Sequence, residues 1–298
     1  MNEQVNFLGA VFSYYTNRSK PLNTPLISNI EISARCNLNC TFCVRNYVKD
    51  NSIMTDETFF NIVNKENRRY LYNPQLFGHG EPLLNPKIVE YVKAVRSYSR
   101  LVGFTTNGLL LNSELSKKLL ENGLTNICFS FEGVDKNIYE KLRCGSNFEK
   151  VAVNIKEFCQ LRTEGGFNCE TKIAIIDLKE THPYLERFKN QWKNIVDEVL
   201  VMPHRDWGEI LQSNKANSKK CFFAWLSFSI LYNGDVVPCC MFEGIRKLKL
   251  GNINEESIMD IWKGVPYQNL RQSMVNNKAP SLCRVCDLTF KNRLFNLF

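Results

Sequence analysis

The stretch Arg35-Cys36-Asn37-Leu38-Asn39-Cys40-Thr41-Phe42-Cys43 holds three cysteines, with three and then two residues between them. It directly follows residues 29–33, whose side chains alternate as they do in a β-strand. Three thiolates can bind three irons of a [4Fe–4S] cluster and leave the fourth iron open to a small molecule. A ferredoxin-type carrier needs a fourth cysteine nearby, and the next one here is Cys128. A zinc site or a chance grouping is the alternative, although zinc sites normally use paired cysteines or histidines.

The composition is that of an ordinary globular protein that is long enough to bury a substantial core. Twelve cysteines without a secretory signal favour metal or redox chemistry over a disulfide framework, and we expect a cytoplasmic location. The longest apolar run, residues 221–232, contains two serines and is too short to span a bilayer. The net charge of +8 is spread over several helical segments, without a basic tract interleaved with aromatic residues. We therefore interpret it as solvated surface, and we do not expect nucleic-acid binding.

From residue 28 onward, strand-like and helix-like stretches alternate six times. The expected strands are residues 29–34, 74–78, 101–106, 125–131, 170–177 and 197–202. The expected helices are residues 55–71, 86–100, 113–122, 147–162 and 183–194. Such alternation predicts an α/β fold with parallel strands and right-handed crossovers. Ligand sites in such folds lie at the carboxyl ends of the strands, which is where the cysteine triplet lies.

Short polar motifs also follow the next three expected strands. They are Gly78-His79-Gly80-Glu81-Pro82, Thr105-Thr106-Asn107-Gly108 and Ser130-Phe131-Glu132-Gly133. Glycines let the backbone approach a ligand closely, and Glu81 can accept a hydrogen bond from an ammonium group. The other two motifs place short polar groups where ligand hydroxyls can be held. His79 is expected to be a packed or hydrogen-bonded histidine rather than a substrate ligand.

Over residues 29–177 the order of these motifs resembles the radical SAM superfamily. The resemblance implies a partial (β/α)6 TIM-type barrel and a [4Fe–4S] cluster on Cys36, Cys40 and Cys43. The open iron would chelate S-adenosylmethionine, whose one-electron cleavage releases a 5′-deoxyadenosyl radical. The residues that match cofactor-binding positions are Phe42 near the adenine, Gly78, Gly80 and Glu81 at the methionyl amino group, Thr106, Asn107, Ser130 and Glu132 at the ribose, and Arg143 at the methionyl carboxylate. The family often has Gly where His79 stands and Asp where Glu132 stands.

A second group of cysteines follows in residues 221–298. Asn233-Gly234 lies between two apolar runs and predicts a β-hairpin. If the turn has two residues, Cys239 lies opposite Phe228, and Cys221 approaches from the loop before the first strand. A four-cysteine zinc site is one interpretation of this unit.

The order of features in this unit resembles the twitch form of the SPASM module: Cys221, a hairpin, Cys239, Leu250-Gly251-Asn252, a helix with Trp262, and Cys283-Arg284-Val285-Cys286. The resemblance implies a second [4Fe–4S] cluster on Cys221, Cys239, Cys283 and Cys286, with no open iron. We expect an N-terminal extension (1–27) outside the main domain, a barrel (28–210) and a small α+β twitch domain (211–298). The cysteines at 128, 159 and 169 are expected to be small buried apolar residues, whereas roles for those at 144 and 240 stay open.

The segment between the two units, residues 201–208, is similar to one that faces the substrate in twitch enzymes. Arg205 is our candidate for substrate binding and charge stabilisation, because arginine is a poor base. His204, which can titrate near neutral pH, is its competitor.

The resemblance implies two-electron oxidation of a hydroxyl-bearing sugar or aminocyclitol-type molecule, with an electron donor such as flavodoxin or ferredoxin. The alternatives are a radical epimerase, an enzyme that modifies a ribosomally made peptide, and a non-catalytic iron–sulfur or zinc protein. About 27 residues precede the core, which favours a small substrate over a peptide with a leader.

Overall fold

A computed structural model describes residues 3–48, 50–212, 220–245 and 248–286 of the chain. The strands are β1 (Leu26–Ile30), β2 (Asn39–Cys40), β3 (Gly103–Thr106), β4 (Asn126–Ser130), β5 (Arg143–Cys144), β6 (Glu170–Asp177), β7 (Glu198–Pro203), β8 (Ser227–Ile230), β9 (Asp235–Val237) and β10 (Gly251–Asn252). The α-helices are α1 (Glu3–Tyr15), α2 (Asp56–Ile62), α3 (Ile88–Arg96), α4 (Ser113–Glu121), α5 (Lys136–Leu142), α6 (Phe148–Glu164), α7 (Leu185–Trp192), α8 (Trp207–Gln212), α9 (Cys240–Ile245), α10 (Ile258–Lys263), α11 (Val265–Val275) and α12 (Ser281–Val285). Short 3₁₀ turns are η1 (Val44–Asn46), η2 (Arg68–Tyr70), η3 (Pro82–Leu84), η4 (His182–Tyr184) and η5 (Phe222–Trp225).

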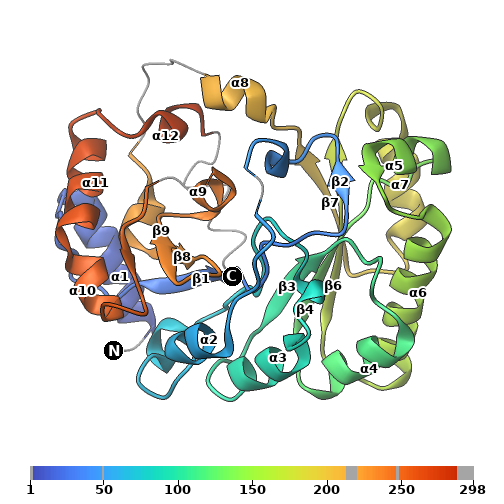
Figure 1. Cartoon of the computed structure of the whole chain (residues 1–298), viewed down its shortest axis with the longest axis horizontal. Helices are drawn as coiled ribbons and strands as arrows, with labels where there is room; N and C mark the ends of the chain where they lie inside the picture. The colour runs from blue at the N-terminus through green and yellow to red at the C-terminus, as the bar shows by residue number, and fades with distance from the viewer. Residues whose placement is uncertain (1–2, 49, 213–219, 246–247, 287–298) are drawn as a thin grey trace.

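Strand β1 lies between the two halves of the molecule (Figure 1). On one edge it pairs in parallel with β8 of the C-terminal unit, which continues into β9 and β10. On the other edge a parallel bridge joins Asn29 to Gln75, and Gln75 is bridged in turn to Gly103 of β3. From there β3, β4, β6 and β7 form a parallel sheet, so the predicted α/β fold is confirmed. The second expected strand, residues 74–78, is represented in the described chain by the two bridges at Gln75.

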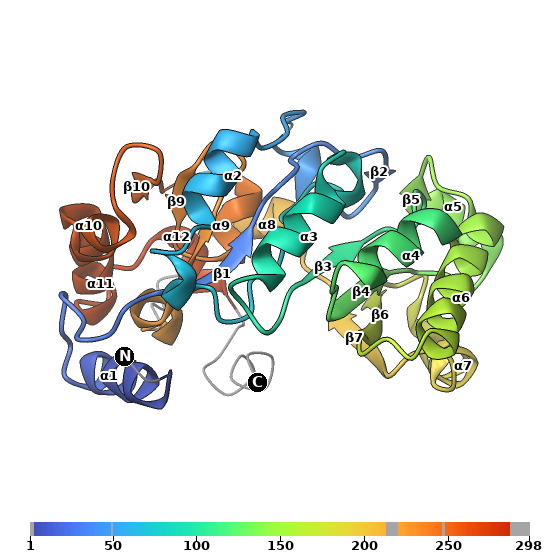
Figure 2. The same ribbon diagram turned by 90° about the horizontal axis from the view of Figure 1, so that it is seen from below.

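Helices cover one face of this parallel sheet and leave the other face open. In β4, Ile127 and Phe129 are buried against α4 and α6, whereas alternate residues of the strand are partly exposed. The same alternation occurs along β6, and Figure 2 shows α4, α6 and α7 on the outer side of the strands. Cys128 lies on this second face beside Thr105 and Lys172, where it is partly exposed, and burial is the main cause that raises the pKa of its thiol to about 12.

The predicted helices are present, four of them with shorter bounds, whereas α6 continues two residues beyond its predicted end. Thr55 caps α2 as its sequence suggests, since its hydroxyl accepts from the backbone N–H of Thr58 at 3.2 Å. The expected helix 55–71 is interrupted after Ile62, where Asn64 accepts from the backbone N–H of Asn67 at 2.9 Å. Asparagine side chains compete for backbone groups in this way and so end helices.

The hairpin between β8 and β9 has a different register from the predicted one. Ser229 pairs with Val237, which puts Cys239 at the level of residue 227 rather than opposite Phe228. The turn contains three residues instead of two, and Gly234 closes it with a φ of +86°. A left-handed glycine at the third position of such a loop is a common solution that Asn-Gly also permits.

The N-terminal extension packs on the C-terminal unit. Helix α1 lies against η5, and Ala10 is buried with Phe222 and Leu226. The segment after α1 is held by two buried tryptophans, since the indole N–H of Trp225 donates to the carbonyl of residue 18 (2.7 Å) and that of Trp262 to the carbonyl of residue 23 (3.0 Å).

Arg271 of α11 is a charged side chain that is fully buried in this region. Its guanidinium lies 4.1 Å from the ring centroid of Trp262 and 4.2 Å from that of Tyr267. It donates to the carbonyls of Ala224 (2.8 Å), Ser19 (2.8 Å) and Trp262 (2.9 Å). Burial lowers its pKa to about 10. One cation therefore joins α11, η5 and the N-terminal segment.

Within the described ranges, no helix has the length and apolar character that crossing a membrane requires.

We predict that Arg271→Met lowers the free energy of unfolding by roughly 3 kcal/mol or more, because it leaves buried carbonyls without donors at about 1–3 kcal/mol each. Denaturant unfolding followed by circular dichroism measures this loss. The matched control is Gln272→Met on the exposed side of the same helix. Equal stability of the two variants would show that the buried cation does not hold these segments together.

Candidate active site

The cysteine loop, residues 36–43, follows β1 and is held by a short antiparallel pairing. Cys40 in β2 pairs with Arg143 in β5. Asn46 fixes the other side of the loop, because its side-chain amide donates to the carbonyls of Cys40 (3.2 Å) and Thr41 (3.1 Å). The loop is therefore tied to the end of α5, the helix that directly precedes β5.

The three thiols of this loop lie close enough to influence one another electrostatically. Cys40 is buried, whereas Cys36 and Cys43 are partly exposed. Burial raises the pKa of the Cys40 thiol to about 12, the Arg143 guanidinium opposes this rise, and negative charge on Cys43 and Cys36 adds to it. The pKa of Cys36 is raised as well, chiefly by burial.

This donor set fits an iron–sulfur cluster. Within the described residues, no three His, Cys, Asp or Glu side chains are placed to hold a metal ion. A cubane cluster needs a wider arrangement than one ion does, because each thiolate binds a different iron. Three soft thiolate ligands beside one guanidinium match that requirement and leave one iron without a protein ligand.

Arg143 and Glu132 form a buried ion pair next to Cys40. Both side chains are almost fully buried, and the Arg143 Nε donates to a Glu132 carboxylate oxygen. The same guanidinium donates from Nη1 to the Cys40 sulfur at 3.8 Å and lies 5.6 Å from the ring centroid of Phe42. The other Glu132 oxygen accepts from the backbone N–H of Ile176 at 3.3 Å. Glu132 thus holds Arg143 against the cysteine loop, while its contact with a ribose stays a prediction.

Glu81 is fully engaged by the protein. Its carboxylate accepts from the Thr106 hydroxyl (2.6 Å) and from the backbone N–H groups of Asn107 (2.8 Å) and Leu83 (3.1 Å). Burial raises its pKa, and these three hydrogen bonds act in the opposite direction. The carboxylate therefore joins the second strand end to the third, and its predicted contact with an amino group is not tested by this geometry.

The glycines of the Gly78-His79-Gly80 motif are required by packing against the chain itself. A Cβ on Gly80 would lie 2.2 Å from the carbonyl oxygen of Ser33, and one on Gly78 would lie 2.6 Å from Glu31 Cγ. Both positions therefore approach the segment that leads into the cysteine loop. Contact of these two glycines with a ligand stays a prediction.

Asn107 connects the third strand end to the cysteine loop, because its side-chain amide donates to the Asn37 side-chain oxygen at 2.8 Å. Asn37 lies between the first two cysteines and was not predicted to take part. Ser130 is partly exposed at the end of β4, in register with Ala174 of β6.

His79 makes the hydrogen bond that its sequence context favoured. Its Nε2 lies 3.1 Å from the carbonyl oxygen of Cys240, and its ring meets that of Trp207 edge-on at 6.1 Å. It therefore joins the barrel to the C-terminal unit. Of the two cysteines whose roles stayed open, Cys240 thus contributes its carbonyl, and Cys144 is exposed with its thiol directed to the carbonyl of Lys141 at 3.3 Å.

A cavity of about 260 Å³ opens beside the cysteine loop at the carboxyl ends of β6 and β7. The structure brings three predicted residues together here: Phe42 from the cysteine loop, and His204 and Arg205 from the loop after β7. The other residues that line it are Thr41, Tyr47, Leu142, Leu178, Glu180, Asp206 and Trp207.

Two residues of the lining, Tyr47 and Glu180, were not predicted as site residues, because no sequence motif contains them. Glu180 was open to prediction in principle, because it follows the end of an expected strand and polar groups at that position belong to the ligand side of the sheet. Tyr47 lies beyond the cysteine triplet in a loop whose path depends on tertiary contacts.

The second cysteine set gathers around an apolar cluster in the C-terminal unit. This cluster contains Val44, Leu231, Val237, Met241, Phe242 and Leu282. Cys239, Cys283 and Cys286 pack against it. Cys221 and Cys239 both raise the pKa of Tyr267, although burial is the larger cause. Three of the four cysteines predicted to bind the second cluster thus pack on one apolar cluster, and Cys221 shares with Cys239 its effect on Tyr267.

Comparisons with known families agree with both cysteine sites. A model of the radical SAM superfamily matches residues 30–181, which is more than half of the chain. A model of SPASM, described as an iron–sulfur cluster-binding domain, matches residues 221–287.

Named relatives have different activities. The tungsten-containing aldehyde ferredoxin oxidoreductase cofactor-modifying protein of Pyrococcus furiosus is 23% identical over 87% of this chain and 86% of its own length. The 7,8-dihydro-6-hydroxymethylpterin dimethyltransferase of Methanocaldococcus jannaschii is 32% identical over 46% of this chain, which spans about a quarter of that relative (28%).

Solved structures share the fold. The crystal structure of BtrN in complex with AdoMet and 2-DOIA aligns over 89% of this chain and 95% of that chain, with a TM-score of 0.56 and 20% identity. That of Streptococcus suis SuiB bound to precursor peptide SuiA aligns over 99% of this chain and 79% of that chain, with a TM-score of 0.64 and 15% identity.

We predict that Glu132→Gln costs about 3 kcal/mol of unfolding free energy, because it leaves the buried Arg143 cation without its counter-charge. The control is Glu149→Gln, which removes the acid of the exposed Lys136–Glu149 pair and should leave stability unchanged. Denaturant unfolding at neutral pH compares the two variants. A stability loss of similar size in both would contradict a special role for the buried pair.

Proposed function

Because this chain belongs to the radical SAM superfamily, we propose that it cleaves S-adenosylmethionine reductively and oxidises a small hydroxyl-bearing molecule by two electrons. The observation that carries this proposal is the cavity that the cysteine loop shares with the loops after β6 and β7. It sets polar side chains beside Thr41 and Phe42 of the cysteine loop.

Cys36, Cys40 and Cys43 would hold a [4Fe–4S] cluster, and the four cysteines of the C-terminal set would hold a second one. When bound, S-adenosylmethionine and the first cluster would supply a hydrogen-abstracting radical, and the second cluster would take up one electron. The three cysteines of one loop, which is held against Arg143 through Cys40, support the first assignment. The SPASM match and the gathering of the C-terminal cysteines support the second.

We propose that S-adenosylmethionine contacts residues of the cysteine loop and of the strand ends, and that other side chains position these residues. The proposed contacts are Phe42, Gly78, Gly80, Thr106, Asn107, Ser130 and Arg143. Glu81 and Glu132 act mainly through these residues, since their oxygens already bind Thr106, Asn107 and Arg143.

The substrate would be small and polar. The volume of about 260 Å³ lies just below the usual range of ligand cavities, which is about 300–1,000 Å³. The lining supplies one guanidinium, two carboxylates, one imidazole and hydroxyl groups. These groups suit a molecule with several hydroxyl groups. These features favour a sugar or aminocyclitol-type compound over an extended peptide.

We assign binding of the substrate oxygen to Arg205, whose guanidinium offers several N–H donors but accepts no proton. His204 would take the hydroxyl proton on an imidazole nitrogen as the carbonyl of the product forms. Both come from the loop after β7 and line the cavity together with Glu180.

The arrangement of the two cysteine sets favours oxidation over epimerisation. Val44 directly follows Cys43 and belongs to the apolar cluster against which Cys239, Cys283 and Cys286 pack. The end of the cysteine loop and three cysteines of the second set therefore meet at one apolar cluster, a proximity that would favour electron passage to a second cluster. An epimerase would need a thiol at the substrate instead, and no cysteine lines the cavity within the described residues.

We predict that anaerobically reconstituted protein binds about eight irons and forms 5′-deoxyadenosine under reduction. The variant with Ala at Cys36, Cys40 and Cys43 should keep about four irons and form none, because the second cluster has no open iron. The Cys221→Ala, Cys283→Ala variant should keep about four irons and still cleave the cofactor without yielding oxidised product. Zinc in place of iron, or cleavage by the triple variant, would contradict the proposal.

Product mass distinguishes oxidation from epimerisation in the same assay. Polyols, amino sugars and a tungsten-cofactor precursor are the substrates to compare, the last because of the relative's name. Oxidation removes two hydrogens, whereas epimerisation leaves the mass unchanged in water and adds deuterium in heavy water.

We predict that Arg205→Met lowers kcat/KM for the accepted substrate about 10- to 100-fold, because a charge-assisted hydrogen bond worth about 1.5–3 kcal/mol is lost. Steady-state product formation measures it, with Arg187→Met on exposed α7 as the control. An unchanged kcat/KM in the Arg205 variant would remove this residue from the substrate site.

A further inference from the structure

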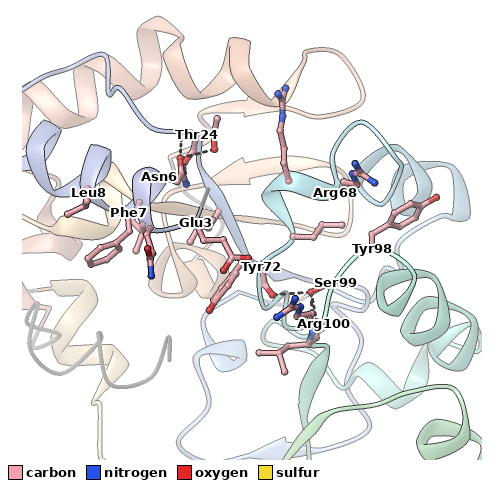
Figure 3. A pocket seen from close by; sticks show the side chains of 16 residues that line it. Glu3, Asn6, Phe7, Leu8, Thr24, Arg68, Tyr72, Tyr98, Ser99 and Arg100 are labelled. Carbon is pink, nitrogen blue, oxygen red and sulfur yellow. Dashed lines mark hydrogen bonds between the residues drawn. The ribbon is translucent and has the colours of Figure 1, made fainter. Parts of the chain in front are cut away.

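A second, larger cavity lies on the opposite side of β1 from the cysteine loop. It has a volume of about 1,000 Å³ and is open to solvent between α1, η2 and the segment that leads into β3 (Figure 3). Leu26, the first residue of β1, and Leu226, which precedes β8, also line it. The cavity is thus at the amino end of the strand whose carboxyl end leads to the proposed active site.

The polar groups on the floor of this cavity are already satisfied by the protein. The Asn6 side chain exchanges hydrogen bonds with the backbone of Thr24 at 3.1 and 2.8 Å and accepts from the Thr24 hydroxyl. The Ser99 hydroxyl donates to the carbonyls of Tyr72 (3.0 Å) and Leu101 (2.8 Å). A specific small-molecule site needs convergent polar groups that remain available to the ligand. The floor instead offers an apolar and aromatic surface.

The rim, in contrast, carries uncompensated positive charge. Arg68, Arg69 and Arg100 line the cavity and are exposed. Among the described residues, none of these three guanidiniums forms an ion pair, and Glu3 is the acidic side chain in the lining. Figure 3 shows Arg68 and Arg100 on the same side as Tyr98, across from Phe7 and Leu8 of α1.

The apolar floor continues onto the outer face of α1. Val5, Leu8 and Phe12 are 52–64% exposed, and Leu8 also lines the cavity. Exposed apolar patches rimmed by polar residues mark sites of protein association. The combination of an apolar centre and a basic rim favours an acidic protein partner.

Aromatic contacts join this surface to the second cysteine set. The Phe7 ring in the cavity wall meets the Phe222 ring at 5.9 Å, and Phe222 directly follows Cys221. Phe222 and Tyr14 meet at 5.5 Å. A group docked in the cavity is therefore separated from Cys221 by this aromatic packing.

We propose that this cavity and the adjoining face of α1 bind an acidic, flavin-bearing one-electron carrier protein that exchanges electrons with the second cluster. The proposal rests on the proposed function, since it takes Cys221 as a ligand of that cluster. The apolar floor suits the dimethylbenzene edge of a flavin, and the three arginines suit acidic groups around it. A carrier docked here would be close to the second cluster and far from the substrate cavity.

The electron transfer is balanced as follows. After substrate oxidation the second cluster holds one extra electron, and it returns to its oxidised state by giving up that electron. The oxidised flavin takes up this electron and one proton from water and becomes the neutral semiquinone. The carrier can then return the electron at the next turnover, because cleavage of S-adenosylmethionine consumes one electron.

The test compares two variants with equal changes of charge. The first carries Arg68→Glu, Arg69→Glu and Arg100→Glu. The second carries Lys156→Glu on α6, Arg187→Glu on α7 and Lys193→Glu directly after α7, and these helices lie at the other end of the molecule from α1 (Figure 2). Binding of oxidised flavodoxin to each reconstituted protein is measured by biolayer interferometry at low and high salt. Iron content and thermal unfolding verify that both variants are folded.

We expect the first variant to bind flavodoxin about tenfold or more weakly at low salt, with the difference reduced at high salt, and the second to bind nearly as well as the unaltered protein. Equal weakening in both variants, or none in the first, would overturn the proposal. So would arginine-dependent binding of a [2Fe–2S] ferredoxin that is tighter than that of flavodoxin, or self-association through this face in place of carrier binding.

A second measurement separates this proposal from the proposed function. The protein with Ala at Cys36, Cys40 and Cys43 is reduced by dithionite, freed of excess reductant and mixed with oxidised flavodoxin. We expect the flavin semiquinone to appear quickly, and more slowly when the three arginines are replaced. If this protein holds no iron, the cluster assignment is wrong, whereas arginine-independent semiquinone formation overturns the docking site alone.

Discussion

The hydrogen bonding of β1 on both of its edges is the constraint on which the rest of the architecture depends. Its parallel pairing with β8 fixes the C-terminal unit beside the barrel, and its bridge to Gln75 fixes the barrel strands. The cysteine loop follows the carboxyl end of this strand. The same strand thereby sets the relation between the first cysteine set and the second, whose members come from segments before and after β8 in the chain.

The cofactor side of the sheet is built by contacts among strand ends rather than by isolated ligands. Glu81 joins two strand ends through Thr106 and Asn107, and Asn107 reaches on to Asn37 between the cysteines. Arg143 is fixed by Glu132 before it meets Cys40. Buried polar groups that are fully bonded in this way hold a site rigid before any ligand binds. Rigidity of this kind suits a reaction whose radical has to meet one particular hydrogen.

Much of this arrangement could be predicted from the sequence, because the hydrophobic period and the polar residues after each strand are local signals. These signals predicted the succession of strands and helices along the chain. They also identified Phe42, His204 and Arg205, which line one cavity. The hairpin register was not, because Asn233-Gly234 permits both a two-residue and a three-residue turn. Three other features depend on contacts between distant segments. They are the pairing of Glu132 with Arg143, the burial of Arg271 and the partial exposure of Cys128. No local pattern encodes such contacts.

The three carbonyls of residues 18, 19 and 23 find their partners in Trp225, Arg271 and Trp262, more than two hundred residues later. During synthesis, this segment therefore waits for more than two hundred further residues before its hydrogen bonds can form. Folding of the C-terminal half must close this long loop, which makes it a late and slow event. Until then α1 is without Phe222 and Leu226, the residues against which Ala10 is buried.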